Sequence, residues 1–390
     1  MDRPASPSGR PRFDIADIVR AHRSRLEALQ TLSAAQRRAL SAIERCRTAA
    51  LGGHLDFCPA CGHEHPSYNS CRNRHCPKCQ HLAQERWITD RAERLLPVPH
   101  FHVVFTLPSA LRPLARRFPR QVFGALSRAT TETLLDLGRS RLDATLGVTT
   151  VLHTWTRDLH FHPHIHAIVT AGGLATDGAR WSPTNPKYLF PVKVMGSLLR
   201  GKILYALRRL SARGELHGLD PDTLEHTIAR AARTDWVVYA KKPFRRSDHV
   251  LKYLGRYTHR VAIANSRLVR VTSETVDFHT KDGKIASLDP VEFLHRFVLH
   301  ILPKGFKKIR HAGLYAAACV YGSLARARAL LSPTSQSISP TDVTQLLSWE
   351  DKLRELTGRD VTRCPVCGSS LVRIQLPSPV SRSPPVKVSA

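Results

Sequence analysis

The sequence predicts an α+β protein that folds as more than one unit, and two observations support this. Strand-like and helix-like segments follow one another without the regular repeat of a doubly wound sheet. The 390 residues, of which 42% are hydrophobic, exceed the usual size of a single core but are ample to build one. We therefore expect a main domain of mixed strands and helices, with smaller units before and after it.

Five segments are expected from end to end. Residues 1–12 are rich in Pro, Ser and Arg and are expected to form a disordered basic arm. Residues 13–96 combine helical periodicity with a cysteine-rich stretch, and residues 97–310 form the main domain. Residues 311–375 hold a helical region with a Cys-x-x-Cys pair, and the Pro- and Ser-rich residues 376–390 are expected to be a disordered tail.

Apolar periodicity within these segments predicts the individual elements. Helices are expected over residues 13–50 (one or two), 81–96, 118–137, 194–213 and 248–260. Strands are expected over residues 102–107, 148–155, 162–170, 235–240 and 267–279. Pro97 and Pro99 end the second helical stretch and mark the first domain boundary.

The charge of the chain indicates a polyanionic partner. Lys and Arg number 59 against 31 Asp and Glu, which gives a formal net charge of +28. An anionic membrane would also suit this charge, but no stretch approaches the ~20 apolar residues of a spanning helix, and no apolar signal sequence opens the chain. We therefore expect nucleic acid as the partner, no membrane association, and a location in the cytoplasm with the nucleoid. No pattern indicates the oligomeric state.

Two cysteine pairs near the N-terminus have the spacing of a zinc site. They are Cys58 with Cys61 and, after fourteen residues, Cys76 with Cys79. Such knuckles can place four thiolates around one Zn²⁺ in tetrahedral geometry, whereas buried thiols without a metal seldom show this spacing. Cys71 or a nearby histidine could replace one of the four. A second ion could be shared with Cys46 and His54.

A zinc site in so polar a segment serves at least to stabilise its fold. Arg72, Arg74 and Lys78 surround the knuckles, so we expect this region also to present cations to phosphate. Cys364 and Cys367 supply only half the ligands of another zinc site. They could borrow further ligands, bridge two subunits or bind nothing.

A dense run of histidines indicates a second metal site. Four histidines fall within seven residues from His160 to His166, inside an expected strand. Side chains alternate across a strand, so His164 and His166 point to one face while Ile165 points to the other. Half-exposed polar residues are the usual explanation of a lone His-x-His, but packing does not explain this density. Two neutral imidazoles on one face suit a divalent ion.

Two tyrosines at helical spacing are candidate nucleophiles. Tyr253 and Tyr257 stand four residues apart in an expected helix, so both phenols face the same side, about 6 Å apart in axial rise. Ordinary amphipathic packing would explain an isolated pair, but Lys252, Arg256 and Arg260 make this segment strongly basic. A phenol near a divalent ion could attack a scissile phosphate and yield a phosphotyrosyl DNA end.

Taken together, these motifs resemble the two-tyrosine transposases of the insertion-sequence-91 family. The resemblance covers most of the chain and rests on five segments, which are 70–80, 102–108, 162–166, 253–263 and 302–306. It implies a nuclease domain with an antiparallel sheet flanked by helices, of the class named HUH for two histidines around a hydrophobic residue. It also implies rolling-circle transposition, in which single-stranded DNA is cleaved and joined through 5′-phosphotyrosine intermediates.

The resemblance further implies roles for individual residues. His164 and His166 would be the ligands of a catalytic Mg²⁺ or Mn²⁺, and Tyr253 and Tyr257 would act in turn as nucleophiles. A third metal ligand would come from elsewhere, and His259, His102 and His160 are the candidates. The substrates would be the single-stranded ends of a mobile element and a short target tract.

Further contacts to DNA are expected from basic clusters that contain aromatic residues. The two clusters span residues 241–246 and 304–310, and each could follow phosphates while stacking an unpaired base. Solvated loops are the alternative. The residues expected to bind DNA are Arg72, Arg74, Lys78, Lys241, Lys242, Arg245, Arg256, Arg260, Lys307 and Lys308.

Two rival functions fit parts of the same pattern. A plasmid replication initiator or relaxase would use the same HUH chemistry, and only the N-terminal cysteine pairs and the resemblance favour a transposase over it. A zinc-ribbon transcription factor without enzymatic activity would need the charge but neither the histidines nor the tyrosines.

Overall fold

The computed structural model of the 390-residue chain describes most of its residues. The described residues are 12–80, 84, 85, 87, 88, 91, 94–244, 262–331, 354, 358 and 360–379. Residues 1–11 of the expected basic arm, the expected helix over 248–260 and most of the expected tail therefore lie outside the described residues. Among the described residues, no helix combines the length and the apolar character needed to cross a membrane.

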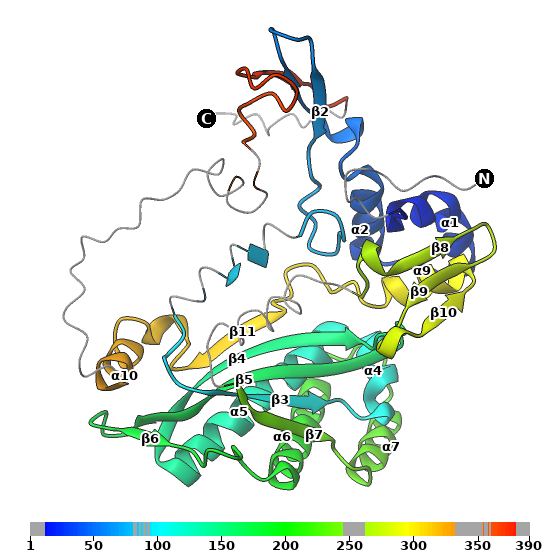
Figure 1. Cartoon of the computed structure of the whole chain (residues 1–390). Coiled ribbons are helices and arrows are strands. Elements are labelled where there is room, and N and C mark those ends of the chain that lie inside the picture. Colours follow the sequence, from blue (N-terminus) through cyan, green and yellow to red (C-terminus); the bar gives the residue numbers. More distant parts are fainter. Residues whose placement is uncertain are drawn as a thin grey trace, which may run out of the picture.

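The largest unit is a six-stranded sheet covered on one face by helices (Figure 1). The strands run in the order β11-β4-β5-β3-β7, with β6 paired to β5, and all pairings are antiparallel. Their bounds are β3 His100–Thr106, β4 Ala144–Trp155, β5 Phe161–Ala175, β6 Trp181–Pro183, β7 Val238–Phe244 and β11 Ile309–Gly313. The helices are α4 Arg112–Arg117, α5 Pro119–Leu142, α6 Val192–Ala212 and α7 Pro221–Ala232. The structure thus confirms the α+β class and the antiparallel sheet.

The core of this unit lies between one face of the sheet and the helices. Phe101, Phe105 and Ile165 from the sheet pack with Phe123 and Leu199 from the helices, and all five are buried. Sequence analysis missed helix α7, although Asp220 caps it and Pro221 stands in its first turn, which are ordinary signals of a helix start.

The two N-terminal helices belong to a second unit whose other elements come from much later in the chain. Helices α1 (Ile15–Leu29) and α2 (Ala34–Arg45) share one buried cluster with β8 (Leu268–Val271), β9 (Val276–His279), β10 (Ile285–Leu288) and α9 (Pro290–Val298). The expected boundary at residue 97 therefore does not separate two cores, because a boundary placed along the chain cannot show which distant segments bury each other. The strand expected over 267–279 is a hairpin of β8 and β9.

A third unit is a ribbon of three antiparallel strands drawn from both ends of the chain (Figure 1). Strands β1 (Gly53–Phe57) and β2 (Glu64–Tyr68) form a hairpin, and β12 (Val372–Leu376) pairs with β1. The C-terminal residues 360–379 thus return to the N-terminal ribbon, and Leu376, which was expected to begin a disordered tail, ends a strand. Helix α10 (Ser323–Leu331) packs separately against β5 and β6.

Candidate metal centre

The open face of the large sheet, opposite the helices, carries a group of histidines. Alternation along β5 sends Ile165, Ala167 and Val169 into the core between the sheet and the helices. His164 and His166 point to the opposite face, as expected from the sequence. His153 of β4 lies directly across from His164 in the sheet register and joins them.

Three imidazoles converge closely enough to hold one ion. The ligand nitrogens of His153, His164 and His166 all lie within 4.8 Å of one another, and the Nε2 atoms of His164 and His166 are 3.1 Å apart. His153 was not among the residues expected from the sequence. It lies in a strand that was correctly expected, but nothing in the sequence shows which strand pairs with the histidine strand, or in what register.

Hydrogen bonds orient two of these rings. His164 donates from Nδ1 to the carbonyl oxygen of His162 at 2.6 Å, which leaves its Nε2 lone pair facing the site. The Nδ1 of His166 lies 2.8 Å from Nε2 of His102, which is buried on β3. When His166 donates this bond, its Nε2 lone pair also faces the site, and His102 fixes the orientation of the His166 ring through the nitrogen that points away from the metal.

Burial keeps these histidines neutral near pH 7. Desolvation lowers the pKa of His164 and of His102 to about 4, and it lowers the pKa of His166 well below its usual value. The charges of Lys241 and Lys308 add to the effect on His166. Neutral imidazole is the form that binds metal, so the group is prepared to accept a cation.

The other candidates for a third ligand lie elsewhere. His102 contacts His166 from behind and is not one of the three converging residues. His160 is exposed, with its Nδ1 2.6 Å from Asp158 and its Nε2 3.3 Å from Arg296. His259 lies outside the described residues.

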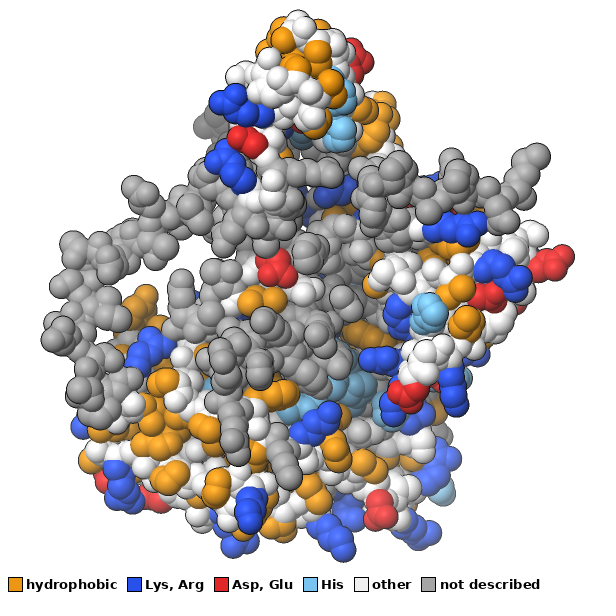
Figure 2. All heavy atoms as spheres, viewed as in Figure 1, with side chains coloured by type: hydrophobic (Ala, Val, Ile, Leu, Met, Phe, Trp, Pro, Cys, Tyr) orange, Lys and Arg blue, Asp and Glu red, His pale blue; other side chains and the backbone are white. Residues whose placement is uncertain are grey.

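A cleft of about 600 Å³ opens over the three histidines. Its walls include Trp155, Arg157 and the turn between β9 and β10, with Lys281 and Lys284. Figure 2 shows histidine side chains gathered over the sheet with Lys and Arg around them. The cleft therefore brings the cations of Arg157, Lys281 and Lys284, together with the carboxylates of Asp158 and Asp282, close to the three histidines.

Two of the lysines expected to bind DNA lie close to this centre. The ammonium of Lys308 stands 5.0 Å from the centroid of the Trp155 ring, and burial lowers the pKa of Lys308 to about 7. Lys241 is exposed on β7, directly across from His102 in the register. Lys307 is also exposed.

The two tyrosines lie outside the described residues. So do Arg245, Arg256 and Arg260, and the side chain of Lys242 is not described. The last described residue before this segment is Phe244, whose ring centroid is 6.5 Å from that of His102.

The structure corrects the expected zinc site. Cys76 and Cys79 lie with Cys46 and Cys71, whereas Cys58 and Cys61 lie with Cys364 and Cys367. The two expected pairs therefore do not surround one ion. The reason is topological, because Cys46 and Cys71 complete the group around Cys76 and Cys79, while Cys58 and Cys61 meet two cysteines from the C-terminal part of the chain.

The three basic residues near the cluster of Cys46, Cys71, Cys76 and Cys79 make different contacts. Arg74 is partly buried and donates to the backbone carbonyls of Pro303 and Phe306. Lys78 forms an ion pair with Asp14. Arg72 is exposed, which leaves it the best placed of the three to meet phosphate.

The sequence of this chain matches those of known transposases. A family described as "Putative transposase" matches residues 147–321, and one described as "Transposase zinc-binding domain" matches residues 18–107. The chain is 41% identical over 370 residues to "Putative transposase y4qJ" of Sinorhizobium fredii, which covers 91% of this chain and 92% of that protein. The chain belongs to the insertion-sequence-91 family of transposases. A second relative of this transposase is the "Transposase for insertion sequence element IS801" of Pseudomonas savastanoi pv. phaseolicola, 30% identical over 84% of this chain and 80% of the relative.

Membership in this family makes DNA the partner of the protein and zinc a component of its N-terminal region. It favours a transposase over a replication initiator or a transcription factor. Among solved structures, "Conjugative Relaxase Trwc In Complex With Orit DNA. Metal-Bound Structure" matches with a TM-score of 0.24 and 14% identity, over 40% of this transposase and 70% of that chain. A similarity at this level carries no argument about function.

Proposed function

We propose that this transposase works by HUH chemistry, cleaving and joining single-stranded DNA in rolling-circle transposition. The observation that carries the proposal is the convergence of His153, His164 and His166 at the floor of an open cleft. Tyr253 and Tyr257 are the proposed nucleophiles. His153 takes the place of the third ligand that the sequence left open.

The donor set fits a divalent transition ion. Three neutral imidazole nitrogens suit Mn²⁺ better than Mg²⁺, which prefers oxygen ligands. Three protein ligands leave positions open for phosphate oxygens and water. A bound divalent ion would polarise a phosphate oxygen and stabilise the charge that develops in the transition state.

The residues of the chain would divide the remaining work. The phenol oxygen of one tyrosine attacks the scissile phosphorus, a 5′-phosphotyrosyl bond forms, and the bond to the 3′-oxygen breaks to leave a free 3′-hydroxyl. The free energy of the phosphoester bond is retained in the phosphotyrosyl bond. Attack of a DNA 3′-hydroxyl on the phosphorus of that bond can therefore rejoin strands and release the tyrosine without ATP. The second tyrosine allows a second cleavage while the first link persists.

Covalent geometry allows the tyrosines to reach the histidines. Phe244 lies against His102, and Tyr253 follows it by nine residues, which span at most roughly 30 Å when fully extended. Around the cleft, Arg157, Lys281 and Lys284 are placed to bind phosphates.

A 3′-end-labelled single strand carrying an end of the mobile element tests the proposal, because the 5′-phosphotyrosyl bond holds the fragment on the 3′ side of the cleaved bond. Incubation with Mn²⁺ is expected to give a labelled protein band that survives SDS, and chelation is expected to abolish it. The Tyr253→Phe/Tyr257→Phe double variant and His164→Ala should give no band, whereas His160→Ala, which changes an exposed histidine outside the cluster, should keep it. A gel shift that SDS removes from the wild-type protein would instead indicate a DNA-binding protein without this chemistry.

A further inference from the structure

The second cysteine cluster joins residues that are about three hundred positions apart. Sγ of Cys61 lies 3.7 Å from Sγ of Cys364, and Sγ of Cys58 lies 3.4 Å from Sγ of Cys367. Four thiolates at about 2.3 Å from a tetrahedral Zn²⁺ are separated from one another by about 3.8 Å. The sulfur separations are therefore those of a zinc site, and they are far longer than the ~2.05 Å of a disulfide.

The two halves of this cluster have matching sequence and matching turns. Both read Cys-Pro-x-Cys-Gly, at residues 58–62 and 364–368. In each, the glycine has a positive φ and donates its N–H to the carbonyl of the first cysteine at 2.9 Å. The first cysteine in turn donates its N–H to the residue after the glycine, at 2.9 Å to His63 and at 2.8 Å to Ser369. Two such turns facing each other present four sulfurs to one point.

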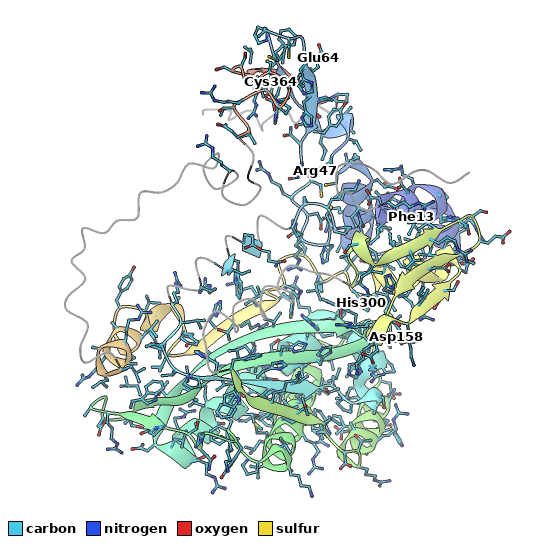
Figure 3. The ribbon with its side chains drawn as sticks, viewed as in Figure 1. Phe13, Arg47, Glu64, Asp158, His300 and Cys364 are labelled. Atoms are coloured by element: carbon cyan, nitrogen blue, oxygen red, sulfur yellow. The ribbon has the colours of Figure 1, made fainter. Side chains whose placement is uncertain are left out.

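Strand pairing holds the two halves together beside the cluster. β12 adds to β1 from Gly53 against Leu376 to Phe57 against Val372. Arg373 forms a two-pronged ion pair with Asp56, with N···O distances of 2.7 and 3.2 Å. Figure 3 shows Cys364 beside Glu64, on the ribbon that the N-terminal segment builds.

From this geometry we propose that Cys58, Cys61, Cys364 and Cys367 bind a zinc ion of their own, in addition to the ion held by Cys46, Cys71, Cys76 and Cys79. This second ion fastens the C-terminal segment to the N-terminal ribbon. The matched zinc-binding family covers residues 18–107, so it includes only half of these ligands. The proposal is independent of the nuclease chemistry.

The fastening also forms a groove of about 820 Å³. Its walls come from both ends of the chain, with Arg47 and His54 on the N-terminal side and Arg363 and Arg373 on the C-terminal side. Besides the ion, the described residues join these walls through the strand pairing, the ion pair of Arg373 with Asp56 and a hydrogen bond from Ser378 to the carbonyl oxygen of Ala50. The C-terminal segment thus adds Arg363 and Arg373 to a groove that also holds Asp56 and Asp360.

Counting zinc in the purified full-length protein tests the proposal, with His164→Ala in every sample so that the three clustered histidines do not add zinc to the count. The protein with all its cysteines should hold two ions per chain, and the Cys364→Ser/Cys367→Ser variant should hold one. Cys319→Ser, which changes a cysteine outside both clusters, should hold two. One ion in the protein with all its cysteines, or two in the double variant, would overturn the proposal.

A second measurement uses the wild-type protein alone, so that it does not depend on how a variant folds. Cys61 and Cys367 are exposed, so solvent exclusion cannot protect them from alkylation. With zinc bound, both should resist iodoacetamide, and a chelator should make both react. Rapid labelling of Cys61 and Cys367 in the zinc-loaded protein would refute the second site. A disulfide between them would also block alkylation, but a reductant and not a chelator would then restore the reaction with iodoacetamide.

Discussion

Replacing His102 tests how the metal centre is oriented. His102 does not belong to the three converging histidines, yet its Nε2 lies 2.8 Å from Nδ1 of His166 and it is only 1% exposed. Phe in its place would remove the hydrogen bond between His102 and Nδ1 of His166, so the orientation and tautomer of that imidazole would be less firmly fixed. Gln would restore a carbonyl oxygen that can accept the bond.

The expected size of the effect follows from the role of this bond. Losing a residue that orients a metal-bound histidine weakens metal binding by about 10- to 100-fold, which is roughly 1.4 to 2.7 kcal/mol. We therefore expect His102→Phe to weaken Mn²⁺ binding by that factor in isothermal titration calorimetry. His102→Gln should recover most of the loss.

His100 provides a matched control. It lies two residues away on the same strand and is fully buried, but its Nε2 is 2.7 Å from the hydroxyl of Tyr315, away from the metal centre. His100→Phe should destabilise the fold about as much as His102→Phe and leave Mn²⁺ affinity unchanged. Equal Mn²⁺ affinity in His102→Phe and the wild-type protein would refute the orienting role.

Three further outcomes are expected. His153→Ala should weaken Mn²⁺ binding more than His102→Phe does and abolish the covalent DNA adduct, whereas His160→Ala should do neither; an adduct that survives in His153→Ala would remove His153 from the centre. Arg72→Ala should reduce the slope of log K against log salt for single-stranded DNA binding by about 0.7. Arg74→Met should leave that slope unchanged, but urea unfolding should show that it lowers the stability of the fold by roughly 2 kcal/mol or more. His300 accepts from Thr154, donates to Leu159 and lies in the interior, and burial lowers its pKa to about 3. Below about pH 6.5 the unfolded chain takes up a proton at His300, whereas the folded chain does not. The free energy of unfolding should therefore fall between pH 7 and pH 5, with up to about 1.4 kcal/mol per pH unit coming from this group. In His300→Gln the urea midpoint should fall less over the same pH range.

Local patterns predicted much of the fold. The expected strand over 148–155 is most of β4, and the expected helix over 194–213 is nearly the whole of α6. Each depends on which side chains alternate or recur within a short window, which the sequence displays directly. The same alternation places His164 on the open face of the sheet and Ile165 on the face that packs against the helices.

What the sequence could not predict depends on contacts between distant segments. His153 joins the metal centre only because β4 pairs with β5 in one particular register. Cys364 joins a cysteine cluster with Cys58, which lies 306 positions earlier in the chain (364 − 58), and a lone Cys-x-x-Cys pair does not reveal its partner. In the same way, α1 finds its core against α9. Spacing along the chain carries no information about such pairings.

The central claim is that the three histidines and the two tyrosines act on one DNA phosphate. Mass spectrometry of the peptide that carries the covalent DNA adduct tests it most directly. The label is expected on Tyr253 or Tyr257, and it should shift to the remaining tyrosine when one of the two is changed to Phe. Label on any other residue of the wild-type protein would contradict the account.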